Sequence, residues 1–290
     1  MPYRAPEYFQ DLIMLQTILH GLTIGGILYI ISIGLSLTFG AMGIVNFAHG
    51  LIYTLGAYIL FAVLTNLGGS FILGTIIAVI IAIPVSYLIE RYVIRRLYGE
   101  SLDYAIIATY AVLLIGVDAI KWIWGPRPLP ISDPLGITLK FFFLEMPLYR
   151  LIIIGLSLLI FFGLSLFFKK TIIGKIVVAG LQDQEAVRSL GINLNKYLAI
   201  IFVLGSVLGA LGGVLYAPIS TLHPYMGFHI LILCFAVVIV GGMGNLQGTA
   251  LAALGLGLVM AITGRYYGPA AEAMVYVVMA VVLIFRPIDV

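Results

Sequence analysis

The sequence predicts an all-α polytopic membrane protein with about eight to ten transmembrane helices. Of its 290 residues, 62% are hydrophobic and only 9% are charged, whereas soluble domains are about 45–50% apolar and about 25% charged. Apolar segments close to the length of about 20 residues that a helix needs to cross the bilayer recur along the whole chain. Helices are predicted rather than strands, because a helix satisfies its backbone hydrogen bonds within one segment and the alternating pattern of a barrel is missing.

Nine apolar segments are the candidate spans of a single membrane domain, residues 1–290. They cover residues 12–39, 51–67, 71–89, 104–124, 151–168, 198–217, 228–240, 249–263 and 270–285. Two of them are unusual, because the first contains several glycines and the seventh is short and ends in a glycine-rich run. Such segments can be broken or re-entrant helices that surround a transport path. Alternatively, the glycines allow ordinary helices to pack closely, and the sequence leaves both interpretations open.

The positively charged residues predict the orientation of the chain in the membrane. Arg91, Arg95 and Arg96 follow the third candidate span, and five more Lys and Arg residues lie in the segment 169–197. Because Lys and Arg collect in cytoplasmic loops, both segments are expected in the cytoplasm and the loop 125–146 on the outer side. The net charge of +3 is too small to favour a nucleic-acid partner.

The sequence lacks the patterns of an enzyme, a metal site or an ATPase. Cys234 is its single cysteine, and its four histidines do not have the spacing of metal ligands. It has no phosphate-binding loop of the form GxxxxGK followed by Ser or Thr, and no strong candidate for an ion-coupling carboxylate deep in a span. We therefore expect no cofactor, metal or catalytic residue here, and a partner must supply the energy if a solute moves uphill. A stand-alone secondary carrier or channel is the alternative.

The polar segment 169–197 predicts a short helix in the cytoplasm. Residues 182–190 have the composition of two to three helical turns. Gln182 or Asp183 can cap the start of this helix, and Gly191 can end it. A short amphipathic helix in a cytoplasmic loop either lies on the membrane surface or docks into a groove of another protein. Composition alone does not decide between these two uses.

Several motifs stand in order along nearly the whole chain. The run Asn46-Phe47-Ala48-His49-Gly50 is followed by LGAY at 55–58, and Glu185-Ala186-Val187 is followed after three residues by Gly191. Pro224-Tyr225-Met226-Gly227 then precedes VGGMGN at 240–245, and the chain closes with FRP at 285–287. Together these motifs resemble the permease subunits of high-affinity branched-chain amino-acid importers of the ABC class. The resemblance is closest to the H-type permease.

The resemblance gives the cytoplasmic segment a role. The run at 185–191 is similar to the EAA loop of ABC-importer permeases, the coupling helix that fits a cleft on the ATPase subunit. The residues expected to dock the ATPase are Asp183, Glu185, Ala186 and Gly191. One departure is Val178, which stands where the family usually has an arginine.

The resemblance also implies a location in the plasma (inner) membrane and a set of partners. These are a second permease subunit of the M type, two cytoplasmic ATPase subunits that bind the ATP, an extracytoplasmic solute-binding protein and the lipid bilayer. The implied solutes are branched-chain amino acids. Urea, short amides and other small amino acids are the alternatives, because urea permeases resemble this subunit closely.

Five residues are candidates for the solute path. They are Asn46 and His49 after the first span, Tyr225 and Gly227 at the outer mouth, and Asn245 near an inner gate. For His49 the alternative is a hydrogen bond that locks two helices together. For Tyr225 and Gly227 the alternative is anchoring at the membrane interface, which is common for tyrosine.

Overall fold

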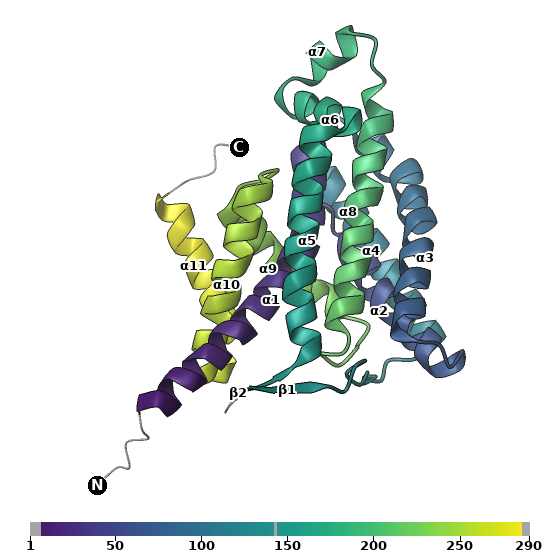
Figure 1. The fold of residues 1–290 in the computed structure, drawn as a ribbon. Coiled ribbons are helices and arrows are strands. Elements are labelled where there is room, and N and C mark those ends of the chain that lie inside the picture. The colour runs from purple at the N-terminus through teal and green to yellow at the C-terminus, as the bar shows by residue number, and fades with distance from the viewer. Residues whose placement is uncertain (1–6, 142–143, 286–290) are drawn as a thin grey trace.

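The computed structural model describes residues 7–141 and 144–285, which form a bundle of long helices (Figure 1). The described residues contain eleven α-helices and one small antiparallel hairpin, made of β1 (Thr138–Phe141) and β2 (Leu144–Pro147). The helices are α1 (Glu7–Met42), α2 (Ala48–Asn66), α3 (Phe71–Tyr92), α4 (Leu102–Trp124), α5 (Leu148–Lys170), α6 (Ile172–Gln182), α7 (Gln184–Ser189), α8 (Leu194–Tyr216), α9 (Met226–Gly241), α10 (Leu246–Tyr266) and α11 (Ala271–Phe285).

The predicted class of fold is confirmed. Within the described residues, eight helices are long and apolar enough to cross a membrane, and α9 is a shorter apolar helix of 16 residues. At 1.5 Å per residue α9 rises about 24 Å, somewhat less than the hydrocarbon core of about 30 Å. Each of the nine candidate spans corresponds to one of these helices. The hairpin β1–β2 was not predicted.

The two ends of the bundle match the predicted orientation. Helices α6 and α7 lie at one end and the hairpin β1–β2 lies at the other (Figure 1). Arg95, which follows α3, and Lys196, at the start of α8, line the same cavity, so the two basic segments share one end. The concentration of positive charge assigns this end to the cytoplasm. The first residues of α10 lie beside Lys169 at the same end, so α9 must cross back from the outer side.

The centre of the bundle is formed by α1, α2, α8 and α9. Residues 25–38 of α1 are all buried, whereas α3, α5 and α11 expose apolar side chains such as Ile80, Leu159 and Ile284, as expected of surfaces that face lipid. With 36 residues, α1 rises about 54 Å. A helix longer than the bilayer thickness tilts, and the N-terminal half of α1 leans away from the other helices (Figure 1).

The glycines of the first span serve close packing. Helix α1 is unbroken up to Met42. A Cβ atom built on Gly34 would overlap the carbonyl oxygen of Gly205 in α8, and one built on Gly25 would lie 2.8 Å from the Cα of Leu254 in α10. Close approach through small residues is how helices associate in membranes. For this span the structure therefore favours packing over a broken helix.

The chain leaves the helical conformation at glycines beyond α1 and α9. Gly43 has a φ of +67°, directly after α1, and Gly242 and Gly244 have φ values of +86° and +76°, directly after α9. These left-handed conformations are easily accessible only to glycine. The predicted break after residue 240 is confirmed.

Candidate functional sites at the cytoplasmic end, in the core and at the outer end

The cytoplasmic segment forms two helices, where the sequence predicted one over residues 182–190. Gln182 is the last residue of α6, and α7 covers Gln184–Ser189. Asp183 between them is extended, and its Oδ1 accepts a hydrogen bond from the backbone N–H of Ala186 at 2.9 Å. Because this side chain satisfies a free N–H of α7, it begins a new helix and ends α6. The turn after α7 is made by Gly191, with a φ of +76°.

The predicted docking residues are all on the surface of this segment. Asp183, Glu185, Ala186 and Gly191 are exposed, whereas Val187 is only 5% exposed and belongs to the hydrophobic core. Helix α7 is therefore fixed by one apolar side chain and presents its polar residues to the cytoplasm. This is an arrangement that a partner protein can contact.

Helix α7 also contacts the central helix of the bundle. The side-chain amide of Gln184 donates a hydrogen bond to the carbonyl oxygen of Ala41, in the last turn of α1, at 3.5 Å. Val178 of α6 lines a cavity of about 230 Å³ together with Lys169 and Asn245. The position where the family usually has an arginine therefore lies beside a lysine from α5.

Removing the cap of α7 tests how this short helix is held. We expect Asp183→Ala to destabilise α7 locally by about 1 kcal/mol, since the N–H of Ala186 loses its acceptor. Hydrogen exchange of residues 184–189 should then be about fivefold faster. Asp183→Ser, which keeps a capping oxygen, should exchange as the wild type does. Equal exchange in all three proteins would show that the cap is not needed.

Asn46 and His49 lie in the core, where the chain passes from α1 into α2. The His49 ring is fully buried, and its Nε2–H donates to the carbonyl oxygen of Ile31 at 3.0 Å. The ring lies against the backbones of Gly34 and Gly209. This geometry fits the second interpretation of His49, a hydrogen bond that locks α2 to α1.

The side chain of Asn46 differs from that of His49, because it has no internal partner. It is 1% exposed, and neither its amide nitrogen nor its amide oxygen has a hydrogen-bond partner among the described residues. Leaving such a group unpaired costs about 1–3 kcal/mol, so it calls for an explanation. Its part in the solute path stays a prediction.

The remaining path candidates lie at three different places. Tyr225 is 47% exposed, and its hydroxyl oxygen accepts a hydrogen bond of 2.9 Å from Lys121 of α4. Gly227 is buried where α9 crosses α2, and a Cβ there would overlap the carbonyl oxygen of Gly50. The structure therefore places Gly227 in a helix crossing at the start of α9, and its part in the solute path stays a prediction. Asn245 lies at the cytoplasmic end and caps α10 through a bond of 3.0 Å from the N–H of Gly248.

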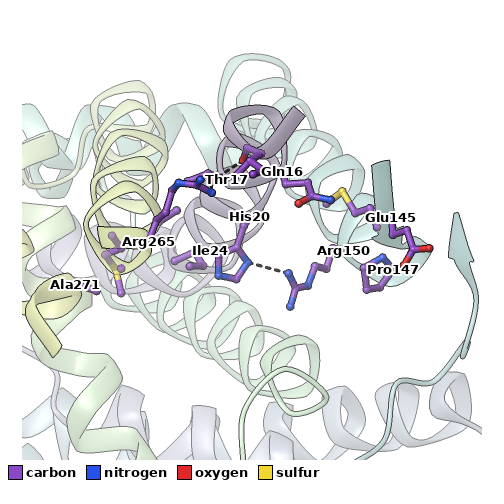
Figure 2. Close-up of a pocket in the computed structure, with 14 residues that line it drawn as sticks. Gln16, Thr17, His20, Ile24, Glu145, Pro147, Arg150, Arg265 and Ala271 are labelled. Atoms are coloured by element: carbon purple, nitrogen blue, oxygen red, sulfur yellow. Dashed lines mark hydrogen bonds between the residues drawn. The ribbon is translucent and has the colours of Figure 1, made fainter. Parts of the chain in front are cut away.

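A cavity of about 500 Å³ at the outer end was not predicted (Figure 2). It lies between the outer halves of α1 and α10 and the start of α5. Arg150 of α5 donates a hydrogen bond to Nδ1 of His20 at 3.0 Å, and Arg265 of α10 donates to the hydroxyl of Thr17 at 3.4 Å. These residues are far apart in the sequence and form no motif. The one available signal was an arginine at the outer end of each of two spans, because Lys and Arg are usually concentrated on the cytoplasmic side.

Comparison with known proteins gives the family. Residues 17–286 match the family described as "Branched-chain amino acid transport system / permease component". The high-affinity branched-chain amino acid transport system permease protein BraD of Pseudomonas aeruginosa is 29% identical over 94% of this chain and 94% of its own length. LivH of Salmonella typhimurium is 26% identical over 96% of this chain and 95% of its own length. The probable permease protein LivM of Methanocaldococcus jannaschii is 26% identical over 79% of this chain and 76% of its own length. Because the family match covers almost the whole chain, this multi-pass inner-membrane protein belongs to the family of permease components of branched-chain amino acid transport systems.

Proposed function

We propose that this chain is the permease subunit of an ABC importer and moves branched-chain amino acids across the inner membrane. The observation that carries the proposal is the capped helix α7, which stands exposed at the cytoplasmic end of a permease-family bundle and contacts α1. Solute would enter from the outer side and leave into the cytoplasm. Separate ATPase subunits would bind the ATP, so the chain would be neither an enzyme nor the holder of a cofactor.

The proposed assembly has four kinds of component. A second permease subunit would complete the membrane part, which the similarity to proteins named both LivH and LivM supports. Two ATPase subunits would contact the cytoplasmic end, and an external binding protein would deliver the solute. The lipid-facing helices α3 and α5 leave ample apolar surface for the bilayer and for the second permease.

The contacts of α7 suggest how ATP hydrolysis would drive transport. When the two ATPase subunits close on ATP, the subunit that contacts this chain would move α7. Val187 ties α7 to the core and Gln184 ties it to the end of α1. The movement would therefore reach the turn that contains Asn46 as a shift of packed helices, and access would change from one side to the other. Asp183, Glu185, Ala186 and Gly191 would form the docking surface.

The proposed solute path passes the candidate residues at different depths. Asn46 would offer its unpaired amide in the core, and Tyr225 and Asn245 would lie toward the outer and inner ends. In this proposal, His49 and Gly227 act by holding helices together around the path.

A stand-alone secondary carrier is the second candidate function. Such a carrier needs an ion-coupling carboxylate, and Glu90 is the candidate. It is fully buried near the cytoplasmic end of α3. Its two oxygens accept hydrogen bonds from Arg95, at 3.0 and 2.6 Å, and one also accepts from Tyr98 at 2.9 Å. Both carboxylate oxygens are thus occupied by donors from the protein itself, which does not favour the binding of a coupling ion that a carrier needs.

Reconstitution tests the proposal. The chain would be purified with the second permease, the ATPase and the binding protein encoded beside it, and placed in proteoliposomes. We expect uptake of radiolabelled leucine that requires both ATP and binding protein. Uptake by this chain alone, driven by a proton or sodium gradient, would support the carrier instead. ATP-driven uptake of urea but not leucine would keep the importer and change its solute.

A further inference from the structure

The outer cavity, lined by Thr17, His20, Arg150 and Arg265 among others, carries an excess of positive charge. Its lining contains two arginines and one carboxylate, Glu145, among the described side chains. That carboxylate is bound by Lys140 at 2.8 Å, a pair that raises the pKa of Lys140 through their hydrogen bond. Arg150 and Arg265 therefore face the cavity without a carboxylate partner among the described residues.

The hydrogen bonds in the cavity leave donors free. An arginine can only donate, so Nδ1 of His20 must accept the bond from Arg150, and the ring proton lies on Nε2. Arg150 uses one of its five N–H donors in this bond and Arg265 uses one on Thr17. In the view of Figure 2, the two arginines approach α1 from opposite sides, with His20 between them. The described part of the cavity therefore offers donors and a positive field, which suit a carboxylate or phosphate group.

Apolar side chains make up other parts of the wall. Ile13 and Ile24 come from α1, and Met260 and Ala261 come from α10. A volume of about 500 Å³ lies in the range of small-molecule sites, which combine apolar walls with a few polar groups. A small molecule with one carboxylate and an apolar body fits this combination. The amide oxygen of Gln16 at the wall can accept a hydrogen bond from an ammonium group.

We propose that the outer cavity receives the carboxylate of the amino-acid solute through Arg150 and Arg265, before the solute passes into the membrane. This inference rests on the proposed function, because it takes the solute from that proposal. The cavity lies at the outer end of the bundle, where an external binding protein would release its solute. The same chemistry would suit the phosphate of an anionic lipid, and the experiment separates these two sources.

Binding and uptake are measured on the complete importer. In nanodiscs of phosphatidylcholine, we expect Arg150→Gln and Arg265→Gln each to weaken leucine binding about tenfold or more, because a charge-assisted hydrogen bond is lost. Arg150→Lys should recover part of the loss. The control is Arg127→Gln, an exposed outer arginine outside the cavity lining, which should bind leucine as the wild type does. Leucinamide, which lacks the carboxylate, should bind weakly to the wild type and equally weakly to Arg150→Gln.

Each other outcome overturns the inference. If the correctly folded variants Arg150→Gln and Arg265→Gln bind leucine as tightly as Arg127→Gln does, the cavity is not a leucine site. A difference that appears only in nanodiscs with phosphatidylglycerol, and for leucine and leucinamide alike, would assign the cavity to a lipid head group. If the wild-type importer takes up no leucine with ATP, the proposed function fails. If it takes up leucine and the arginine variants do so with unchanged KM, only the further inference fails.

Discussion

Replacing Gly191 by proline should reduce ATP-driven uptake by the reconstituted importer at least tenfold, while the chain still inserts in the membrane. Gly191 has a φ of +76°, and its N–H donates to the carbonyl oxygen of Arg188 at 3.0 Å. Proline fixes φ near −65° and has no N–H, so the turn after α7 cannot form. Helix α7 would then point in another direction and lose the ATPase, which co-purification measures directly.

Two further variants show whether the turn or the contact surface matters. Gly191→Ala should have a much smaller effect, because a Cβ there meets open space and only the left-handed backbone is strained. Glu185→Arg keeps the turn and reverses an exposed charge, and should also weaken co-purification. Gly155→Ala in α5, where a Cβ again meets open space, serves as the control. Unchanged ATPase binding in both Gly191→Pro and Glu185→Arg would contradict the docking assignment.

The sequence predicted the features that depend on local chemistry. The spans follow from apolar length, and the cap by Asp183 and the stop at Gly191 follow from what these residue types do at helix ends. Helix α6 was not predicted, because its sequence was interpreted as part of a polar loop. Yet Ile173, Ile176 and Val177 have the i, i+3, i+4 spacing of one helical face, so periodicity could have found α6.

Features that depend on partners distant in sequence could not be predicted. Whether Gly34 breaks a helix or packs it depends on Gly205, and nothing near Gly34 indicates that partner. The outer cavity likewise joins Thr17, Arg150 and Arg265 from three helices. The crossing of Gly227 with Gly50 of α2 could not be predicted for the same reason. Motifs identified these residues as notable, but only the packing assigns them a place.

The contact between α1 and α8 gives the largest expected loss of stability. Gly34 and Gly205 face each other so closely that a Cβ on Gly205 would lie 2.6 Å from the carbonyl oxygen of Gly34, and a Cβ on Gly34 would lie 2.9 Å from Cε1 of His49. Valine at position 34 would push against a backbone that cannot move aside without separating the two central helices. We expect Gly34→Val to destabilise the protein by about 3 kcal/mol or more, at the upper end for overpacked cores.

The matched control for this variant is Gly255→Val in α10. It makes the same chemical change in a helix, but at an exposed position where a Cβ meets open space. Thermal unfolding in detergent, followed by size-exclusion chromatography, should show a clearly lower midpoint for Gly34→Val and a wild-type midpoint for Gly255→Val. If the two variants have the same unfolding midpoint, α1 and α8 do not cross at these glycines. The glycines of the first span would then have to be explained by a break in the helix, and the path from α7 through α1 to Asn46 would lose its rigid support.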